Sequence, residues 1–286
     1  MTRAEAPRVL GVVGAGTMGS GIAQLGAVAG LTTRLHDPDP EALQRGIGRI
    51  TRQLDREVSR GRMELAAADR ARASLYPAAS LTELADCDLV IEAAPESLQL
   101  KRALFEALSE VVSPECVLAT NTSSLLVTAL ATTASHPQRV VGMHFFNPAP
   151  LMPLVEIVRA ELTADAAFDT AFALGEKLGK HPIRCHDTPG FVVNRVLIPL
   201  LNDCIRVLDE ARVTPEDLDA GMKHGAGWPM GPCELVDLVG IDVHVHASEA
   251  LYEKTREPRM APPPRLVAMK NAGLLGRKSG RGFYAY

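Results

Sequence analysis

Short apolar runs alternate with longer amphipathic segments over the first 185 residues of the chain. Near-continuous apolar runs bounded by polar turns are typical of strands buried on both faces, and the segments between them have the length of helices. We therefore expect an α/β domain with a doubly wound, mostly parallel sheet. The predicted strands are 8–14, 32–37, 88–94, 116–121, 139–146, 154–158 and 181–187, and the predicted helices are 17–29, 39–60, 97–112 and 165–178.

Beyond the last predicted strand, the chain shows no further strand alternation. Thr188 and Pro189 are a typical N-cap and first residue of a helix, so we predict that a helix starts here. Residues 191–211 are apolar on nearly all sides, which predicts a helix buried in a domain core or a subunit interface, and Pro199 should kink it. The chain is interpreted as a sheet domain, residues 1–185, followed by an all-helical domain, residues 186–286.

The composition excludes several classes of protein. With 286 residues, of which 47% are hydrophobic and 22% charged, the chain has the composition of a globular protein rather than a disordered or coiled-coil one. Its net charge of −4 lacks the basic excess of a nucleic-acid-binding protein. We expect no secretory leader, because the start MTRAEAP leads straight into the first predicted strand without an apolar h-region and a small-residue cleavage site. We expect no membrane span, because no run of 18 apolar residues is present. Five cysteines without a C-x-x-C pair favour the reducing cytoplasm.

A glycine-rich motif follows the first predicted strand and opens the first predicted helix. It has the form G-x-G-x-x-G and comprises Gly14, Ala15, Gly16, Thr17, Met18 and Gly19. In this setting the glycines allow a tight turn, the approach of a pyrophosphate and close helix–strand packing, while the helix N-terminus attracts phosphates. Asp37 ends the second predicted strand, where its carboxylate can accept both ribose hydroxyls and disfavour the 2′-phosphate of NADP. We predict a Rossmann-type NAD site, with Arg34 as the nearby feature that would favour NADP.

A histidine and a glutamate flank a proline-rich segment in the second half of the sheet domain. His144 lies near the end of a predicted strand, and parallel α/β sheets bind their ligands at strand ends. Residues 147–153 contain three prolines and can reverse the chain, which would bring Glu156 of the next strand against the imidazole. A histidine oriented by a carboxylate is suited to take the hydroxyl proton when a hydride leaves a carbinol carbon for nicotinamide.

Seven sequence features occur in order along the chain. They are GAGTMG, Asp37, IEAAPE, ATNTSS, GMHFFNPAPLMPLVEIV, DTPGFVVNR and the C-terminal GRKSGRGFYAY. Together they resemble the 3-hydroxyacyl-CoA dehydrogenase family, in its short-chain or 3-hydroxybutyryl-CoA branch, over residues 8–286. The resemblance implies NAD-dependent oxidation of an L-3-hydroxyacyl-CoA to the 3-ketoacyl-CoA, and the reverse reduction. It also implies a homodimer formed through the helical domain.

The same resemblance implies roles for individual residues. His144 would be the catalytic acid and base, with Glu156 as its carboxylate partner. Ser123 would hydrogen-bond the reacting oxygen or the nicotinamide side, and Asn194 would position the substrate and the histidine. The residues implied to lie near the nicotinamide ribose, the cofactor or the substrate are Glu96, Lys101, Asn147 and Lys278, with Lys101 on both the cofactor and the substrate side. Ordinary helix-capping, early-helix or solvated-charge roles are the alternatives for these polar residues.

The residues expected to bind the carrier of the acyl group depart from the family pattern. The family contacts the nucleotide end of CoA with basic residues of the helical hairpin after the second strand, and the lysines expected there are absent. That stretch carries Arg49, Arg52, Arg56, Arg60 and Arg62 instead. Arginine binds phosphate through its bidentate fork, so Arg52 and Arg56 are candidate contacts for CoA or for the phosphopantetheine arm of a carrier protein. A solvated helix face is the alternative.

Several alternatives concern the substrate and the chemistry. The acyl group can be butyryl, a longer straight chain or a dicarboxylic 3-hydroxyadipyl group. An NAD-binding structural protein of the crystallin kind would share the fold without the chemistry. A 3-hydroxyisobutyrate-type dehydrogenase is excluded, because that group has a lysine four residues before its asparagine and Gly190 stands there. His181, Cys185 and His186 lack a fourth ligand and a zinc spacing, so we predict no metal.

Overall fold

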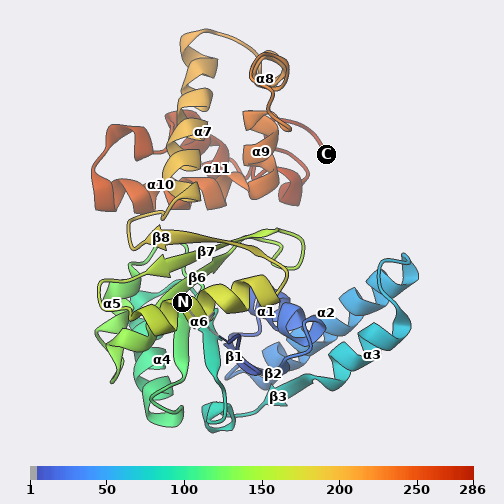
Figure 1. Ribbon diagram of the computed structural model, residues 1–286. Helices are drawn as coiled ribbons and strands as arrows, with labels where there is room; N and C mark the ends of the chain where they lie inside the picture. Colours follow the sequence, from blue (N-terminus) through green and yellow to red (C-terminus); the bar gives the residue numbers. More distant parts are fainter. Residues whose placement is uncertain (1–4) are drawn as a thin grey trace. The chain divides into compact units, whose positions relative to one another are not determined.

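The computed structural model describes residues 5–286. The chain separates into two compact units, one that ends at Thr188 and one that begins at Pro189. The first unit holds a single sheet with its covering helices, and the second unit is helical (Figure 1).

The first unit is built on an eight-stranded sheet with the spatial order β3-β2-β1-β4-β5-β6-β7-β8. Its strands are β1 (Val9–Val13), β2 (Thr32–His36), β3 (Leu75–Ala78), β4 (Leu89–Glu92), β5 (Val117–Thr120), β6 (Val140–Phe145), β7 (Leu154–Arg159) and β8 (His181–His186). Strands β1 to β6 run parallel, β7 pairs with β6 in the antiparallel direction, and β8 is parallel to β7. The predicted mostly parallel, doubly wound sheet is confirmed, with two strands at one edge running the other way.

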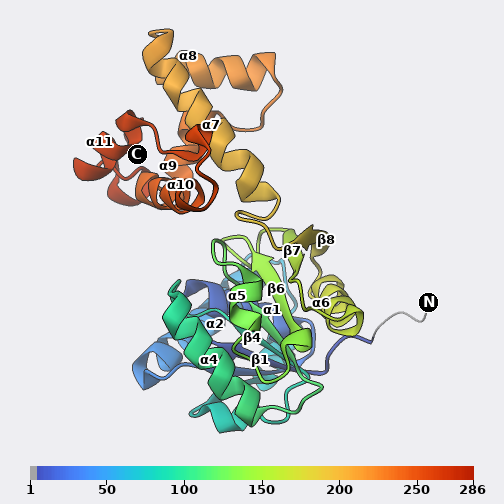
Figure 2. The same ribbon diagram turned by 90° about the vertical axis from the view of Figure 1, so that its left-hand side faces the viewer.

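Helices cover both faces of this sheet. They are α1 (Thr17–Val28), α2 (Pro40–Ser59), α3 (Leu65–Ala73), α4 (Leu98–Val111), α5 (Val127–Ala131) and α6 (Asp165–Lys177), with short 3-10 turns η1 (Leu81–Leu84) and η2 (Pro137–Arg139). Helices α1, α2, α3 and α6 share one hydrophobic core with the sheet, and α4 and α5 pack together over the other face (Figures 1 and 2). Strand residues such as Leu10, Val12 and Ile91 are fully buried, which explains the continuous apolar runs.

The region after α2 shows where the hydrophobic pattern succeeds and where it fails. Asp39 caps the start of α2 by accepting a 2.9 Å hydrogen bond from the amide of Glu41. Gly61 follows the end of the helix with a φ of 65°, a conformation that favours glycine. The pattern predicts neither α3 nor β3. Both have weak apolar periodicity, since α3 is rich in alanine and β3 is a half-exposed edge strand that contains Pro77.

The chain reversal between β6 and β7 is made by residues 147–153, which we call the proline loop. Its three prolines lack an amide N–H, so this segment cannot extend the ladder of β6. A turn hydrogen bond of 3.0 Å from the amide of Met152 to the carbonyl of Pro148 closes the reversal. Strand β7 then runs back along β6, and the register places His144 directly opposite Glu156.

The last residues of the first unit are anchored to α5. The Asp187 carboxylate accepts hydrogen bonds from the amides of Val127 (2.9 Å) and Thr128 (2.7 Å) and from the Thr128 hydroxyl (2.7 Å). The two amides belong to the first turn of α5, where N–H groups have no partner within the helix. Asp187 therefore caps α5 from a distant point in the sequence and fixes the chain just after β8.

The second unit begins differently from the prediction. Its elements are α7 (Val193–Glu210), α8 (Pro215–Ala220), the π-helical turn η3 (Gly221–Gly225), α9 (Pro232–Val239), α10 (Ile241–Thr255), the 3-10 turns η4 (Pro258–Met260) and η5 (Arg277–Ser279), and α11 (Pro264–Asn271). Gly190 and Phe191 have φ values of 78° and 47°, which interrupt a right-handed helix. The helix therefore starts at Val193, and the predicted start at Thr188 is wrong.

Helix α7 is amphipathic rather than apolar on all sides. Ile198, Leu201, Ile205 and Leu208 are buried at helical spacing, whereas Val196 is 62% exposed. One side of α7 is therefore buried in the core of the second unit, as predicted, whereas the apolar Val196 and Val207 (38%) remain exposed, so the predicted subunit interface stays a prediction. Among the helices that the structure describes, none has the length and apolar character needed to cross a membrane.

A buried polar cluster lies inside the second unit. His244, Asn202 and Ser248 are almost fully buried. The His244 Nε2 donates a 2.9 Å hydrogen bond to Asn202 Oδ1, and Asn202 Nδ2 donates to neighbouring carbonyls that include Met260 O at 3.2 Å. Burial lowers the pKa of His244 to about 4, so the imidazole stays neutral under ordinary conditions.

We expect His244 to make the protein less stable as the pH falls. The folded protein keeps this side chain neutral down to about pH 4, whereas the unfolded chain takes up a proton near the ordinary pKa of 6.5. The free energy of unfolding should fall between pH 6.5 and 4, by up to about 3 kcal/mol from this group. Denaturant titrations should show a shallower pH dependence for His244→Gln than for the wild type. His246→Gln is the matched control, since His246 is exposed on the same helix, and equal flattening in both variants would contradict the assignment.

Candidate active site

The glycine-rich turn between β1 and α1 is shaped for a phosphate-bearing ligand. Gly14 has a φ of 100°, and a Cβ there would lie 2.7 Å from the carbonyl oxygen of Ala93. A Cβ on Gly19 would lie 1.7 Å from Gly14 O, so α1 can meet the turn this closely only through a glycine. A Cβ on Gly16 would meet nothing within 4 Å, which leaves its backbone open to a ligand.

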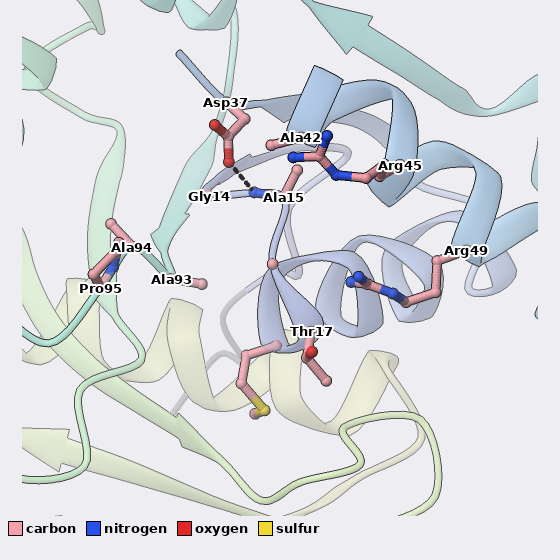
Figure 3. Close-up of a pocket in the computed structure, with 12 residues that line it drawn as sticks. Gly14, Ala15, Thr17, Asp37, Ala42, Arg45, Arg49, Ala93, Ala94 and Pro95 are labelled. Atoms are coloured by element: carbon pink, nitrogen blue, oxygen red, sulfur yellow. Dashed lines mark hydrogen bonds between the residues drawn. The ribbon is translucent and has the colours of Figure 1, made fainter. Parts of the chain in front are cut away.

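A cavity of about 470 Å³ opens beside this turn, and we call it the dinucleotide cavity (Figure 3). It is lined by the turn, by the start of α1, by Asp37, by residues 93–95 and by Arg45 and Arg49 of α2. Asp37 Oδ2 accepts a 2.8 Å hydrogen bond from the amide of Ala15, which fixes the carboxylate after β2. Figure 3 shows Arg49 directed toward the start of α1, where unpaired amides and the helix dipole favour phosphate. Arg45 is directed toward Asp37 and the glycine-rich turn, and it forms ion pairs of 3.2 Å with Asp39 and Glu41.

The lining of this cavity suits a dinucleotide without a 2′-phosphate. Asp37 places a negative charge where a ribose would be recognised, and the amides at the start of α1 are available to a pyrophosphate. Arg34, the residue that would favour NADP, forms an ion pair of 2.5 Å with Asp86 and does not line the cavity. These residues therefore fit NAD better than NADP.

His144 and Glu156 form a buried, hydrogen-bonded pair where β6 meets β7. The distance from His144 Nδ1 to Glu156 Oε2 is 2.7 Å. Glu156 is fully buried and His144 is 6% exposed, while the ring of Phe146 lies 4.6 Å from the imidazole, centre to centre. The reversal expected from the proline loop does bring these two side chains together. A buried carboxylate in this position orients the ring and stabilises its charged form.

The turns that follow β4 and β5 are joined through one carboxylate. Glu96 accepts hydrogen bonds from the hydroxyls of Thr122 (2.5 Å) and Ser124 (2.9 Å) and from the amide of Ser123 (3.2 Å). Burial raises the pKa of Glu96, but the charge of Lys101 and the hydroxyls of Thr122 and Ser124 outweigh it and hold the pKa below its ordinary value. The Ser123 side chain is exposed at this turn.

Lys101 lies inside the protein, so the alternative that it is a solvated charge on a helix surface is wrong. It is 1% exposed, and its Nζ lies 2.6 Å from Glu92 Oε1, 3.2 Å from Ala94 O and 3.3 Å from Glu96 Oε2. Glu92 is fully buried at the end of β4 and also accepts a 2.7 Å hydrogen bond from the hydroxyl of Thr120. The sequence offered a signal for this pair that we did not use, because a glutamate within the apolar run LVIEAA must find a partner when buried.

A second cavity, of about 210 Å³, lies between α1, α2 and the proline loop. Asn147, which the resemblance placed near the nicotinamide ribose, is exposed and lines this cavity rather than the dinucleotide cavity. Gln24 of α1 and Gln53 of α2 also line it. The side chains that line the second cavity thus include three amides and Arg49, and no carboxylate.

Arg49 is the arginine of α2 that lines both cavities. Its Nη1 donates a 2.8 Å hydrogen bond to the hydroxyl of Ser20 on α1, which holds the guanidinium over the boundary between the two. Arg52 and Arg56 are exposed on the same helix and line neither cavity. The sequence did not distinguish Arg49 from the other arginines, because only the contact with Ser20 sets it apart.

Two of the predicted site residues belong to the second unit. Asn194 is half-buried in the first turn of α7, and Lys278 in η5 forms an ion pair of 2.5 Å with Asp242. Their roles at the cofactor and the substrate stay predictions. Within residues 5–286, no group of three or more His, Cys, Asp or Glu side chains is arranged to hold a metal ion.

These features define a class of protein. A glycine-rich turn after the first strand, a carboxylate after the second, and a histidine oriented by a buried glutamate are the parts of a nicotinamide-dependent dehydrogenase. Residues 9–188 match the family model described as 3-hydroxyacyl-CoA dehydrogenase, NAD binding domain, and residues 190–286 match that of the 3-hydroxyacyl-CoA dehydrogenase, C-terminal domain. The chain belongs to the 3-hydroxyacyl-CoA dehydrogenase family, and NAD is its cofactor.

Individual relatives cover almost the whole chain. A probable 3-hydroxybutyryl-CoA dehydrogenase of Deinococcus radiodurans is 44% identical over 276 residues, which are 96% of this chain and 99% of that protein. The crystal structure of (S)-3-hydroxybutyryl-CoA dehydrogenase from Ralstonia eutropha is 41% identical, with a TM-score of 0.94 over 98% of this chain and 99% of its own. A 3-hydroxyadipyl-CoA dehydrogenase of Escherichia coli is 43% identical over 97% of this chain and 58% of its own length.

We expect Lys101→Met to destabilise the protein strongly. The substitution keeps most of the side-chain volume but leaves the Glu92 carboxylate buried without its ion-pair partner. The free energy of unfolding should fall by about 3–5 kcal/mol, measured by denaturant titration. Lys270→Met is the control, because Lys270 lies 3.9 Å from Glu249 in a solvent-exposed pair and should cost less than about 1 kcal/mol. Similar losses in the two variants would contradict the importance of the buried pair.

Proposed function

We propose that this chain catalyses the reversible oxidation of a short-chain L-3-hydroxyacyl-CoA to the 3-ketoacyl-CoA, with 3-hydroxybutyryl-CoA as its main substrate. NAD, when bound, accepts the hydride from C3 of the acyl group. The observation that carries the proposal is the 2.7 Å hydrogen bond between His144 and Glu156, in the unit that holds the dinucleotide cavity. Family membership supports the reaction class.

His144 is the acid and base of this proposal. Its Nδ1 is hydrogen bonded to Glu156, so we assign Nε2 to the substrate. In the oxidation, the neutral imidazole accepts the hydroxyl proton at Nε2 as the hydride leaves C3. In the reduction, the imidazolium returns a proton to the carbonyl oxygen. Glu156 keeps the ring in the required orientation and stabilises its positive charge during the step.

The remaining site residues have supporting roles in the proposal. The exposed hydroxyl of Ser123 is suited to donate a hydrogen bond to the reacting oxygen. Lys101 is buried and held by two carboxylates, so we assign it to fixing Glu96 and the turn that carries Ser123 rather than to direct contact with a ligand. From the second unit, Asn194 is proposed to position the substrate and Lys278 to lie near the cofactor.

We assign the phosphate-bearing part of the substrate to the second cavity and to the arginines of α2 beside it. Arg49 lines both cavities, so its guanidinium can meet phosphate groups from either side. Arg52 and Arg56 follow along the same exposed side of α2 and extend the basic surface. CoA and the phosphopantetheine arm of a carrier protein present similar chemistry here, and an assay with free CoA thioesters separates them.

The acyl group is inferred from the relatives. The proteins of D. radiodurans and R. eutropha carry the name 3-hydroxybutyryl-CoA dehydrogenase, which supports a four-carbon acyl group for this chain. The E. coli relative, named 3-hydroxyadipyl-CoA dehydrogenase, has an identity between those of the other two and supports a dicarboxylic acyl group as the second candidate. The two candidates differ by a terminal carboxylate, so direct comparison of their turnover separates them.

We also propose a homodimer in the cytoplasm. The second unit exposes apolar side chains on three helices, namely Val196 of α7 (62% exposed), Leu238 and Val239 of α9 and Val243 of α10 (50%). Exposed apolar groups gathered on one unit are typical of a subunit interface. All five cysteines are free and buried, which agrees with a reducing compartment.

The first test is the oxidation of NADH by acetoacetyl-CoA, followed by NADH absorbance and repeated with NADPH, free acetoacetate and 3-ketoadipyl-CoA. Turnover with acetoacetyl-CoA and NADH, with little from the free acid or NADPH, is the expected result. Faster turnover of 3-ketoadipyl-CoA would favour the dicarboxylic candidate. Binding of NADH without turnover of any thioester, carrier-bound ones included, would favour a structural protein of the crystallin kind.

We expect His144→Gln and Glu156→Gln to lose catalysis while they retain the cofactor. Removal of the acid and base should lower kcat of His144→Gln by about 10²–10⁴. The affinity for NADH, measured by fluorescence titration, should stay within about twofold of wild type, because neither residue lines the dinucleotide cavity. A kcat within tenfold of wild type for His144→Gln would show that another group moves the proton.

A further inference from the structure

One buried lysine holds the proline loop. Lys180 lies just before β8 and is 9% exposed. Its Nζ lies 2.6 Å from Ala149 O, 2.8 Å from Met152 O and 3.4 Å from Pro150 O. An ammonium group has three N–H donors, and all three are directed at carbonyl oxygens of this single loop.

The proline loop needs these donors because of its own sequence. Its prolines contribute carbonyl groups but no N–H groups, and the amides of Leu151 and Met152 both bond to Pro148 O, so the carbonyls of Ala149, Pro150 and Met152 take donors from outside the loop. Among the described ion pairs, none involves Lys180, so carbonyl dipoles take the place of a counter-ion. Burial lowers the pKa of Lys180, which is the expected cost of this arrangement. Burying a charged ammonium group costs free energy, so packing alone does not explain why a lysine occupies this position.

Helix α1 holds the other side of the same loop. A Cβ placed on Gly21 would lie 3.0 Å from Pro150 Cδ and 3.2 Å from Ala149 Cβ, closer than side chains ordinarily approach. The side chains of Ala149 and Pro150 therefore pack closely against α1 at this point. The loop is thus held by Lys180 and is in close contact with α1 at Gly21.

The position of the loop sets the width of the second cavity. Residues 147–151 form one wall of that cavity, and Gln24, Arg49 and Gln53 of α1 and α2 form the facing wall. The loop does not line the dinucleotide cavity. The pairing of His144 with Glu156 is set by the ladder between β6 and β7. Displacement of the loop would thus alter one cavity and leave the cofactor cavity and the catalytic pair in place.

We propose that Lys180 is a positioning residue for the acyl-thioester substrate, which it serves by holding the proline loop at the distance from α1 and α2 that the substrate arm requires. This inference rests on the proposed function, because it assumes that the second cavity receives the thioester. It adds to that function a residue that contacts neither the cofactor cavity nor the catalytic pair, and whose effect is confined to substrate binding.

The test compares Lys180→Met with Lys177→Met, using acetoacetyl-CoA and NADH. Lys177 is an exposed residue at the end of α6 whose Nζ donates to Pro7 O at 3.2 Å, so its substitution removes the same charge from a neighbouring position. Lys180→Met should raise KM for acetoacetyl-CoA by about tenfold or more while kcat stays within about threefold. The affinity for NADH should be unaltered in both variants, and Lys177→Met should keep the wild-type KM.

Gly21→Ala supplies a second test that keeps Lys180 and displaces the loop from the other side. The added methyl group must push Pro150 away, so KM for acetoacetyl-CoA should rise again without a change in the affinity for NADH. Gly21 also lines the second cavity, so both variants act on the same cavity. Because Gly21→Ala retains every charge, a rise of KM in both variants excludes the lost charge of Lys180 as the cause.

Three results would overturn the inference. They are an unchanged KM in both variants, a fall in kcat with KM unaltered, and a loss of NADH affinity that parallels the loss of thioester affinity. The last of these would mean that Lys180 supports the whole unit. A wild-type protein that turns over no acyl thioester would overturn the proposed function, and the inference with it, whereas an active wild type with unaffected variants overturns the inference alone.

Discussion

A carboxylate can orient an imidazole only if the two groups lie side by side, and in a parallel sheet neighbouring strands are joined by a long crossover. This protein brings the pair together with a short reversal, because β7 runs back along β6 after the proline loop. His144 and Glu156 are therefore only 12 residues apart and directly opposite each other in the register. A slip of one residue in this pairing would turn Glu156 to the other face of the sheet. The His144–Glu156 pair, the loop and the second cavity all depend on this one change of direction.

The first unit buries positive charge in two different ways. Lys101 is matched by Glu92 and Glu96, so its charge is balanced by carboxylates and its role is to join the turns after β4 and β5. Lys180 is matched only by carbonyl oxygens of the proline loop. The first arrangement stabilises the turns of the site, while the second holds the proline loop against the sheet. Both lysines lie within the protein, and both act on turns at the end of the sheet where ligands bind.

Much of the site is predictable from the sequence because its parts are local. The glycine turn, Asp37 and the pairing of His144 with Glu156 each depend on a short stretch of chain with a strong pattern. Lys180 escapes prediction because its three acceptors lie about thirty residues earlier and share no pattern with it. The start of α7 is mispredicted for a related reason. Thr188 and Pro189 have the composition of a helix start, and the positive φ of Phe191 has no signature in a bulky aromatic residue.

The capping of α5 by Asp187 has a mechanical consequence. The carboxylate accepts hydrogen bonds from two amides and a hydroxyl of the first unit, so the chain is anchored to within two residues of Pro189, where the second unit begins. The chain changes direction into the second unit within the few residues between Asp187 and the start of α7, and Gly190 adopts the positive φ that this turn contains. The anchor also secures the edge of the sheet, because β8 ends at the residue before Asp187 and pairs along its whole length with β7, the strand that carries Glu156.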